Sequence, residues 1–238
     1  MTENSLANLE RYESQTYSQN GEDGVIARIF EIIGMTNKFF VEFGTGADGK
    51  ERNTRLLQEQ GWRGLLMDAC AADNHPHVRK ESITADNIND LFVKYDVPDV
   101  FDLLSIDIDG NDYWVWQAID DRYRPRVLCM EYNASVPPNE SKTIAYDPDF
   151  QWRGTDYFGA SLLALAQLSK RKGYSLVFCE RTGVNAFFIR DDCAPEIAKT
   201  LDTIYRPCNY RLPRTLTRWW PRKYQHPPDR NYKMIDVA

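Results

Sequence analysis

The sequence lacks the features that mark secreted, membrane-spanning and zinc-binding proteins. No apolar run approaches ~20 residues, the length that a bilayer-crossing helix needs. The first residues, Met1–Ser5, have neither the basic nor the apolar region of a signal peptide. The five cysteines are odd in number and scattered, and no two form a C-x-x-C pair. These absences predict a reduced, cytoplasmic protein with no membrane span, no disulfide framework and no zinc knuckle.

Length and composition are those of an ordinary globular protein. The chain has 238 residues, of which 42% are hydrophobic and 27% charged. We therefore expect a single α/β domain over residues 1–238. Within it, residues 1–37 form an N-terminal helical segment, and residues 206–238 form a tail rich in basic and aromatic side chains.

Residues 39–49, FFVEFGTGADG, are the most informative stretch. The apolar run predicts a buried strand and the glycines a ligand-binding turn, because a residue without Cβ lets backbone N–H groups approach a ligand closely. We expect a nucleoside-containing cofactor over Gly44 and Gly46. The same spacing fits the G-x-G-x-x-G of dinucleotide binders, so NAD is one alternative.

Two features favour S-adenosylmethionine (SAM) over NAD. Glu42 lies two residues before the first glycine, and nearly forty residues precede the strand. Both are typical of class I SAM-dependent methyltransferases, in which the acid faces the methionine part of the cofactor. The next apolar segment, residues 65–68, ends in Asp68, whose carboxylate can accept hydrogen bonds from both ribose hydroxyls.

Three further segments predict strands that end in polar groups. Residues 81–89 predict a third strand followed by the start of a helix, with Asp86 or Asn87 placed to meet the adenine. The fourth strand, over residues 100–106, delivers Asp107 and Asp109, and the fifth, over residues 126–133, delivers Glu131 and Asn133. Ligands of open α/β sheets bind at the carboxyl ends of the strands, so this repetition of acids predicts a site there.

In this order, four stretches resemble the FkbM-like group of SAM-dependent methyltransferases. They are SQNGED at residues 18–23, VEFG at residues 41–44, GWRG at residues 61–64 and FDLLSIDIDG at residues 101–110. The resemblance implies a Rossmann-like class I methyltransferase fold: a seven-stranded sheet of order 3-2-1-4-5-7-6 with helices on both faces. The sequence itself predicts the last pair, because residues 174–180 and 185–190 flank a turn as an antiparallel hairpin does.

Related sugar and catechol O-methyltransferases hold a divalent metal with the acid that ends strand four and with polar residues that end strand five. Asp107, Glu131 and Asn133 offer oxygen ligands that suit Mg²⁺ or Mn²⁺. Alternatively, Asp107, Asp109 and Glu131 act without metal, as general base and hydrogen-bond anchors.

Three loops flank this predicted site. Residues 18–23, which include Gln19, either cap the following helix or fold over the cofactor. His75 and His77, in the loop after the second strand, fit solvated side chains better than metal ligands. The aromatic side chains of the insertion at residues 134–157 either bind a flat or sugar-like acceptor or pack the loop onto the domain.

The tail is a basic patch on an acidic protein. Residues 206–230 carry a charge of about +6 against about −12 for the rest of the chain, and the overall pI is near 5.2. This balance argues against a nucleic-acid footprint. The patch fits a phosphate-bearing acceptor, the acidic body of the domain, or a second subunit in a homo-oligomer.

The sequence thus predicts a SAM-dependent methyltransferase that acts on a hydroxyl of a sugar, a glycan precursor or a natural product. Two alternatives stay open: an NAD-dependent oxidoreductase, and a non-catalytic assembly or binding protein with the same fold.

Overall fold

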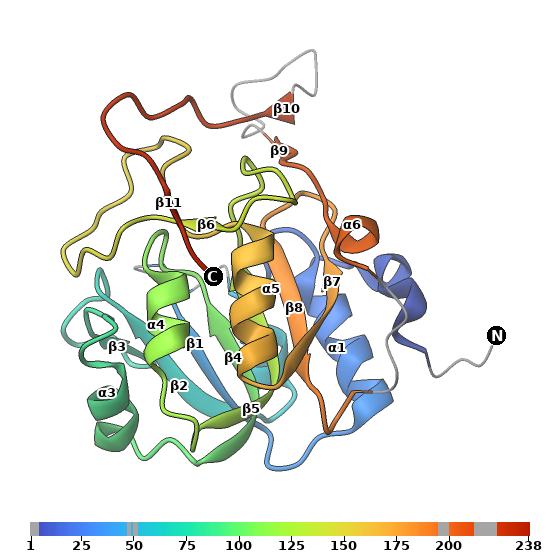
Figure 1. Cartoon of the computed structure of the whole chain (residues 1–238). Coiled ribbons are helices and arrows are strands. Elements are labelled where there is room, and N and C mark those ends of the chain that lie inside the picture. Colours follow the sequence, from blue (N-terminus) through green and yellow to red (C-terminus); the bar gives the residue numbers. More distant parts are fainter. Residues whose placement is uncertain (1–4, 47–48, 50–51, 195–199, 212–222) are drawn as a thin grey trace, which may run out of the picture.

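One seven-stranded sheet organises the molecule (Figure 1). The computed structural model describes residues 5–46, 49, 52–194, 200–211 and 223–238. The strand order is β3-β2-β1-β4-β5-β8-β7. The bounds are β1 Phe39–Phe43, β2 Arg63–Asp68, β3 Val78–Lys80, β4 Val100–Ile106, β5 Arg124–Glu131, β7 Tyr174–Cys179 and β8 Asn185–Arg190. Strand β6 lies outside this sheet. When only the seven strands of the sheet are numbered along the chain, their order is the predicted 3-2-1-4-5-7-6.

Strand directions complete the fold assignment. Strands β1 to β5 are parallel, whereas β8 is antiparallel to both of its neighbours, β5 and β7. The predicted hairpin and the class I methyltransferase fold are therefore confirmed. Parallel strands bring their carboxyl ends to one edge of the sheet, where β1, β2, β4 and β5 all finish.

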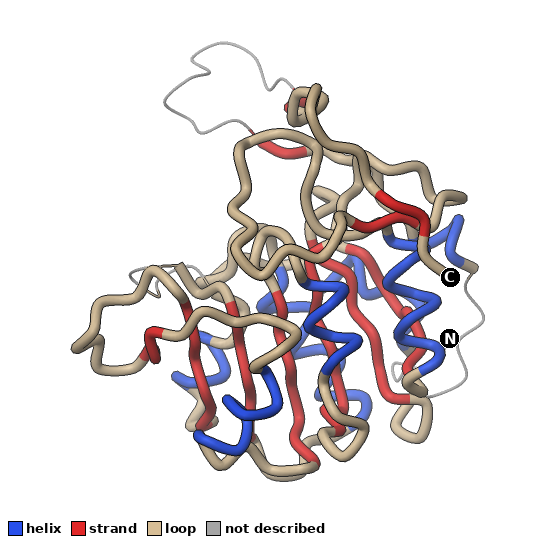
Figure 2. Tube along the Cα trace, turned by 60° about the vertical axis from the view of Figure 1, so that its left-hand side comes forward, coloured by secondary structure: helices blue, strands red, loops and turns tan. Residues whose placement is uncertain are grey.

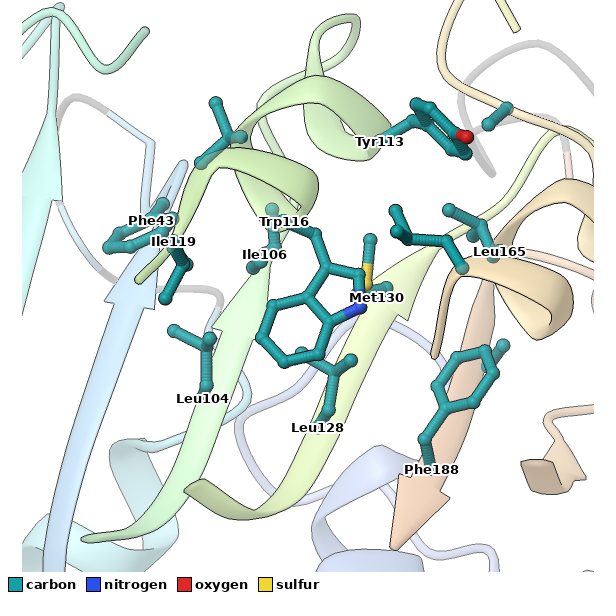
Figure 3. Close-up of a cluster of buried hydrophobic side chains, with 14 of the residues drawn as sticks. Phe43, Leu104, Ile106, Tyr113, Trp116, Ile119, Leu128, Met130, Leu165 and Phe188 are labelled. Atoms are coloured by element: carbon teal, nitrogen blue, oxygen red, sulfur yellow. The ribbon is translucent and has the colours of Figure 1, made fainter. Parts of the chain in front are cut away.

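Helices cover both faces of the sheet (Figure 2). One face packs against η1 (Leu6–Tyr12), α1 (Glu22–Ile33) and α2 (Arg55–Glu59), and the other against α3 (Ile88–Lys94), α4 (Asp112–Ala118) and α5 (Leu162–Arg171). A short helix, α6 (Leu201–Ile204), packs into the hydrophobic core on the face that α3, α4 and α5 cover. The fully buried Trp116 of α4 sits over Leu104 and Leu128 of the central strands (Figure 3). None of the helices in the described part of the chain is both long and apolar enough to cross a membrane.

The third strand lies earlier than the sequence predicts. It spans Val78–Lys80, whereas residues 81–84 have no regular structure. The amide of Asn87 explains this, because its Oδ1 accepts from Thr84 N at 2.9 Å and its Nδ2 donates to Ser82 O at 2.8 Å. This side chain therefore closes a turn before α3.

The insertion at residues 134–157 packs against the C-terminal segment above the carboxyl edge of the sheet (Figures 1 and 2). Strand β6 (Lys142–Thr143) pairs with β11 (Ile235–Asp236), and the rings of Tyr157 and Tyr232 stack at 5.4 Å between centroids. A second small ladder joins β9 (Tyr210–Arg211) to β10 (Lys223–Tyr224). Several of the insertion's aromatic side chains thus serve packing.

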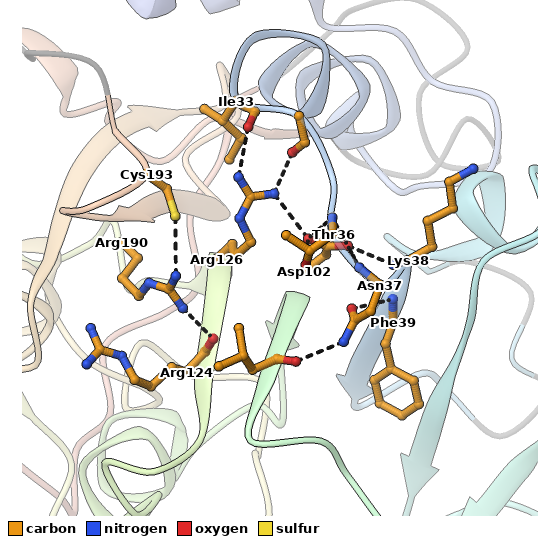
Figure 4. Close-up of polar contacts among 12 residues, drawn as sticks. Ile33, Thr36, Asn37, Lys38, Phe39, Asp102, Arg124, Arg126, Arg190 and Cys193 are labelled. Carbon is orange, nitrogen blue, oxygen red and sulfur yellow. Dashed lines mark hydrogen bonds and ion pairs between the residues drawn. The ribbon is translucent and has the colours of Figure 1, made fainter.

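At the opposite edge, a buried ion pair fixes the amino ends of three strands (Figure 4). The fully buried carboxylate of Asp102 accepts hydrogen bonds from the backbone N–H groups of Thr36, Asn37 and Lys38, and it pairs with Arg126 Nη1 at 3.2 Å. Arg126 also donates to two carbonyls at the end of α1, Ile33 O and Gly34 O. Asp102, the first Asp of the FDLLSIDIDG motif, thus has a structural function.

Candidate functional site

A cavity of about 770 Å³ opens at the carboxyl edge of the sheet. Its wall combines the ends of β1, β2 and β4 with Pro148 and Phe150 from the insertion. Seven of the predicted site residues line it: Gln19, Glu42, Gly44, Gly46, Asp68, Asp107 and Asp109. The structure thus gathers residues from four separate predicted segments around one space.

The glycine turn after β1 needs its glycines for two different reasons. Gly44 has φ +70°, and a Cβ there would lie 1.4 Å from the Asp107 carbonyl oxygen. This close approach brings the β1 and β4 ends together. Gly46 also has φ +70°, but a Cβ there would meet nothing within 4 Å. Gly46 therefore borders open space, as a turn that passes under a ligand should.

Glu42 is buried and used mainly by its own chain. Its Oε1 accepts from Asn53 N at 2.7 Å, and its Oε2 accepts from the backbone N–H and the hydroxyl of Thr54. Burial raises the pKa of this carboxyl, and the hydrogen bonds from Thr54 and Asn53 oppose the rise. Glu42 thus ties the start of α2 to β1 while it lines the cavity.

Asp68 presents a largely uncommitted carboxylate to the cavity. It is only 8% exposed, and its Oδ1 accepts from Cys70 N at 2.7 Å. Among the described residues, its Oδ2 has no hydrogen-bond partner. This oxygen is available to a ligand hydroxyl, in keeping with the predicted ribose contact.

Three carboxylates cluster where β4 and β5 end. Asp107, Asp109 and Glu131 each offer an oxygen within 4.8 Å of the others, and Glu131 Oε2 is buried without a hydrogen-bond partner. Burial, followed by repulsion from neighbouring acids, raises the pKa of both Asp107 and Glu131 well above the usual range. Asp109 is the exposed member of the three, yet desolvation by the surrounding protein and the charge of Asp68 also raise its pKa. The pair Asp107 and Glu131 is therefore suited to hold a proton or a cation.

Asp112, which the sequence analysis did not single out, shapes this cluster. Its Oδ1 accepts from Ile108 N at 2.9 Å and its Oδ2 from Gly110 N at 3.0 Å. These bonds fold the loop after β4 so that Asp109 adopts φ 58°. Burial raises the pKa of Asp112 to about 6. Its position in the first turn of α4, where an acid caps free N–H groups, was the available signal.

Three predicted site residues are engaged elsewhere. Both functions of the fully buried Asn133 amide bind backbone: Nδ2 donates to Asp156 O and Phe158 O, and Oδ1 accepts from Ser135 N. Asp109 therefore takes the place given to Asn133 beside the other acids. Asp86 accepts from the Tyr146 hydroxyl at 2.6 Å, and Asn87 closes the turn before α3. Instead of them, Ser82 and Ile83 line the cavity.

The loop at residues 18–23 is held at the start of α1, and one of its side chains reaches the cavity. Asp23 Oδ2 accepts from the backbone N–H groups of residues 16, 17 and 18, which organises the loop at the start of α1. Gln19 meanwhile lines the cavity. Glu22 accepts from Asn185 Nδ2 at 2.8 Å, and this links the loop to β8.

Asn185, Arg52 and Asn53 also line the cavity, and sequence reasoning missed all three. Asn185 is paired with Glu131 across β8 and β5, and its Oδ1 is buried without a partner. No local motif marks it, because only the hairpin register brings it to the site. Asn53 lies in the turn that Glu42 holds, and its Nδ2 donates to Ser105 Oγ at a distance of 3.0 Å. Residues 212–222 of the basic tail and the side chain of Arg211 lie outside the described part of the structure, so the suggested contact of the tail with a phosphate-bearing acceptor stays a prediction.

The crowding of acids predicts a pH-dependent stability difference between the ligand-free wild type and Asp107→Asn. The pKa of Asp107 lies well above 3.8 in the folded protein, so the folded state binds more protons than the unfolded state above pH ~4. The wild type consequently loses stability relative to Asp107→Asn as pH rises from 4 toward that raised pKa. Thermal melts of both proteins at pH ~5 and ~8 test this. A stability difference that stays constant would contradict it.

Comparisons with known proteins find similarity in structure only. No family model and no curated protein matches the chain. A similar solved structure is an S-adenosylmethionine-dependent methyltransferase from Clostridium acetobutylicum ATCC 824, at 10% identity and a TM-score of 0.39 over 71% of this chain and 89% of that one. Another is the CMeT domain of the citrinin polyketide synthase, at 11% identity and a TM-score of 0.38 over 74% of this chain and 54% of that one. The fold assignment rests on the sheet order, and membership of the FkbM-like group stays a prediction.

Proposed function

We propose that the protein is a SAM-dependent methyltransferase. The observation that carries the proposal is the charge of the cavity above the glycine turn: among the described residues, its wall contains Glu42, Asp68, Asp107 and Asp109 against a single base, Arg52. SAM carries a sulfonium and an ammonium group, so such a wall attracts it. The pyrophosphate of NAD carries two negative charges, which these acids repel.

The sheet order supports the same choice. Dinucleotide-binding sheets have the order 3-2-1-4-5-6, whereas here an antiparallel strand, β8, lies between β5 and β7. An NAD-dependent oxidoreductase therefore fits less well. A non-catalytic binding protein would share both the sheet and the cavity, and only turnover separates it from an enzyme.

The cofactor would lie with its ribose at Asp68 and its sulfonium near Asp107. Gly44 and Gly46 leave room for it above β1, and Gln19 and Glu42 border its amino-acid part. Ser82 and Ile83 border the remaining wall, where the adenine would fit. This arrangement follows the common rule that ligands lie across the carboxyl ends of the central strands.

Methyl transfer needs little covalent help from the protein. When bound, SAM would supply an activated methyl group: the acceptor oxygen would bond to the methyl carbon as the carbon–sulfur bond breaks, and the electron pair of that bond would stay on the departing neutral thioether. The acceptor's proton passes to the carboxylate of Asp107, which acts as general base. Glu131 and Asp109 supply the neighbouring negative charge. Alignment of the two reactants contributes most of the remaining rate.

A divalent cation fits the same cluster. Asp107, Asp109 and Glu131 are hard oxygen donors, and the partnerless Glu131 Oε2 is the kind of atom that a cation satisfies. When bound, Mg²⁺ or Mn²⁺ would lower the pKa of the acceptor hydroxyl. The donor set therefore differs from the one expected from sequence, since Asn133 is engaged elsewhere.

The acceptor would enter past Pro148 and Phe150 of the insertion. Phe150 offers an apolar aromatic side chain to a flat molecule or a sugar, and Asn111 fixes the loop because its Nδ2 donates to Asp147 O at 2.7 Å. We propose a hydroxyl of a sugar, a glycan precursor or a natural product, in some cases phosphate-bearing, as the methylated group. Incubation of cell extract with the protein and isotopically labelled SAM, followed by mass spectrometry, tests this. A labelled product is expected, and unlabelled extract in the presence of active, SAM-binding protein would contradict it.

Replacement of Asp68 by Ala should weaken SAM binding. Loss of hydrogen bonds to a charged group costs about 1.5–3 kcal/mol, or roughly 10- to 150-fold in affinity. Isothermal titration of wild type and variant measures the change. Asp73→Ala, an exposed acid whose partner is Lys80, is the matched control and should leave affinity unchanged. If Asp68→Ala binds SAM as the wild type does, the ribose contact lies elsewhere.

A further inference from the structure

A second cavity, of about 430 Å³, is bordered by Gly49 of the glycine-rich stretch. Helix α2 and the loop before β3 form its walls, and Arg52 lines both cavities. Arg55, His75 and His77 bring further nitrogen donors to the second cavity, and Glu59 is the one acid among the described residues of its wall. The two cavities thus have opposite character, the first acidic and the second basic.

Arg52 is the unusual residue of this cavity. It is 8% exposed, and its Nη2 donates to Gln58 Oε1 at 2.6 Å. Its Nε and Nη1 are buried without an acceptor among the described residues. The guanidinium of Arg52 therefore lies beside Gln58, a residue that lines the second cavity and not the first. The Nε and Nη1 of this guanidinium donate to no described acceptor.

The nearest opposite charge does not satisfy Arg52. Both oxygens of Glu42 accept from the Asn53 and Thr54 backbone, so Glu42 acts on Arg52 only through its charge. Burial lowers the pKa of Arg52, and the charge of Glu42 opposes this. A buried cation with unused donors is costly, and an oxyanion is the ligand that would relieve the cost, because a guanidinium can hold it with two parallel hydrogen bonds.

His75 adds a donor of fixed direction. Its Nδ1 accepts from His77 N at 3.2 Å and from Val78 N at 2.9 Å. The proton of the neutral ring is therefore on Nε2, which is left as a donor. The guanidinium of Arg55, which also lines this cavity, lies 4.3 Å from the centre of the Tyr17 ring.

We propose that the second cavity binds an oxyanion of phosphate or carboxylate type, with Arg52 as its main anchor and Arg55 and His75 as secondary contacts. Two sources fit this chemistry. One is the carboxylate of the bound cofactor, which would reach Arg52 from the first cavity. The other is a separate phosphate-bearing molecule that occupies the second cavity itself.

Inorganic phosphate is the probe, titrated into the full chain at constant ionic strength with chloride as the balancing ion. Arg52→Gln should weaken phosphate binding by at least 10-fold, the scale for hydrogen bonds to a charged group. Arg55→Gln should weaken it less, and Arg63→Gln, an exposed arginine at the start of β2, should leave it unchanged. If Arg52→Gln does not fold, Arg52→Lys, which keeps the charge but loses the planar fork, should still weaken binding several-fold.

Competition distinguishes the two sources. If SAM displaces phosphate and 5′-methylthioadenosine, which lacks the amino-acid part, does not, the anion is the cofactor's carboxylate. If phosphate binds equally well with SAM present, the anion belongs to a separate molecule. The proposal is overturned if phosphate binds no better than chloride, or if the Arg52 variants bind it as the wild type does. Failure of SAM to bind would overturn the proposed function instead and leave the phosphate titration valid.

Discussion

Replacement of Asp107 by Asn is expected to lower the rate of methyl transfer by 100-fold or more while SAM affinity stays within a few-fold. The substitution keeps the size of a half-buried side chain on the cavity wall but removes its negative charge. The amide can neither take the acceptor's proton nor bind a hard cation, and loss of a general base typically costs ~10²–10⁴-fold. Single-turnover rates with labelled SAM, combined with isothermal titration, separate the chemical step from binding.

Asp99→Asn is the matched control for Asp107→Asn. Asp99 is exposed just before the same strand, at the opposite edge of the sheet, so its replacement should leave the rate unchanged. Normal turnover by Asp107→Asn would mean that Asp109 or Glu131 carries the chemistry. Treatment with EDTA separates two forms of the account. Loss of wild-type activity that Mg²⁺ or Mn²⁺ restores supports a metal, whereas an enzyme indifferent to EDTA has Asp107 as a base without metal.

Asp102→Ala is expected to destabilise the protein by about 3–5 kcal/mol, the usual cost of removing one partner of a buried ion pair. The variant leaves Arg126, itself 8% exposed, without its counter-charge, and it leaves three backbone N–H groups at residues 36–38 without their acceptor (Figure 4). Urea unfolding followed by circular dichroism measures the loss.

The exposed Asp99 again provides the control. Asp99→Ala should change the free energy of unfolding by no more than ~0.5 kcal/mol. A loss below ~1 kcal/mol in Asp102→Ala would show that the backbone groups of residues 36–38 find other acceptors. Because Asp102 lies at the amino ends of the strands, folded Asp102→Ala protein should retain SAM affinity, which distinguishes its function from that of Asp107.

The sequence predicts the fold well because local pattern and global packing agree. Apolar runs that end in acids give the parallel strands, and the turn between residues 180 and 185 gives the hairpin. The third strand is wrong by several residues, since β3 is only three residues long and leaves little periodic signal. The fold class was therefore accessible from sequence, while a short edge strand was not.

Site residues could be predicted where they directly follow a strand. They could not be predicted where strand register or the closure of a loop places them at the cavity. Asp68 and Asp107 follow directly from their strands. Asn133 also follows its strand, yet its amide is used by the backbone of the insertion. Asn185 reaches the cavity through the antiparallel pairing of β8 with β5. Arg52 reaches it through the turn that is tied to Glu42. Such contacts have no signature in a single sequence.

Isothermal titration of the full chain with SAM, its demethylated product and NAD tests the central claim most directly. The account predicts that SAM and its product bind, and that NAD does not, because four acids and one arginine line the cavity in the described part of the chain. SAM should bind more tightly than the neutral thioether product, and added salt should narrow the difference. Binding of NAD in the absence of any SAM binding would contradict the account.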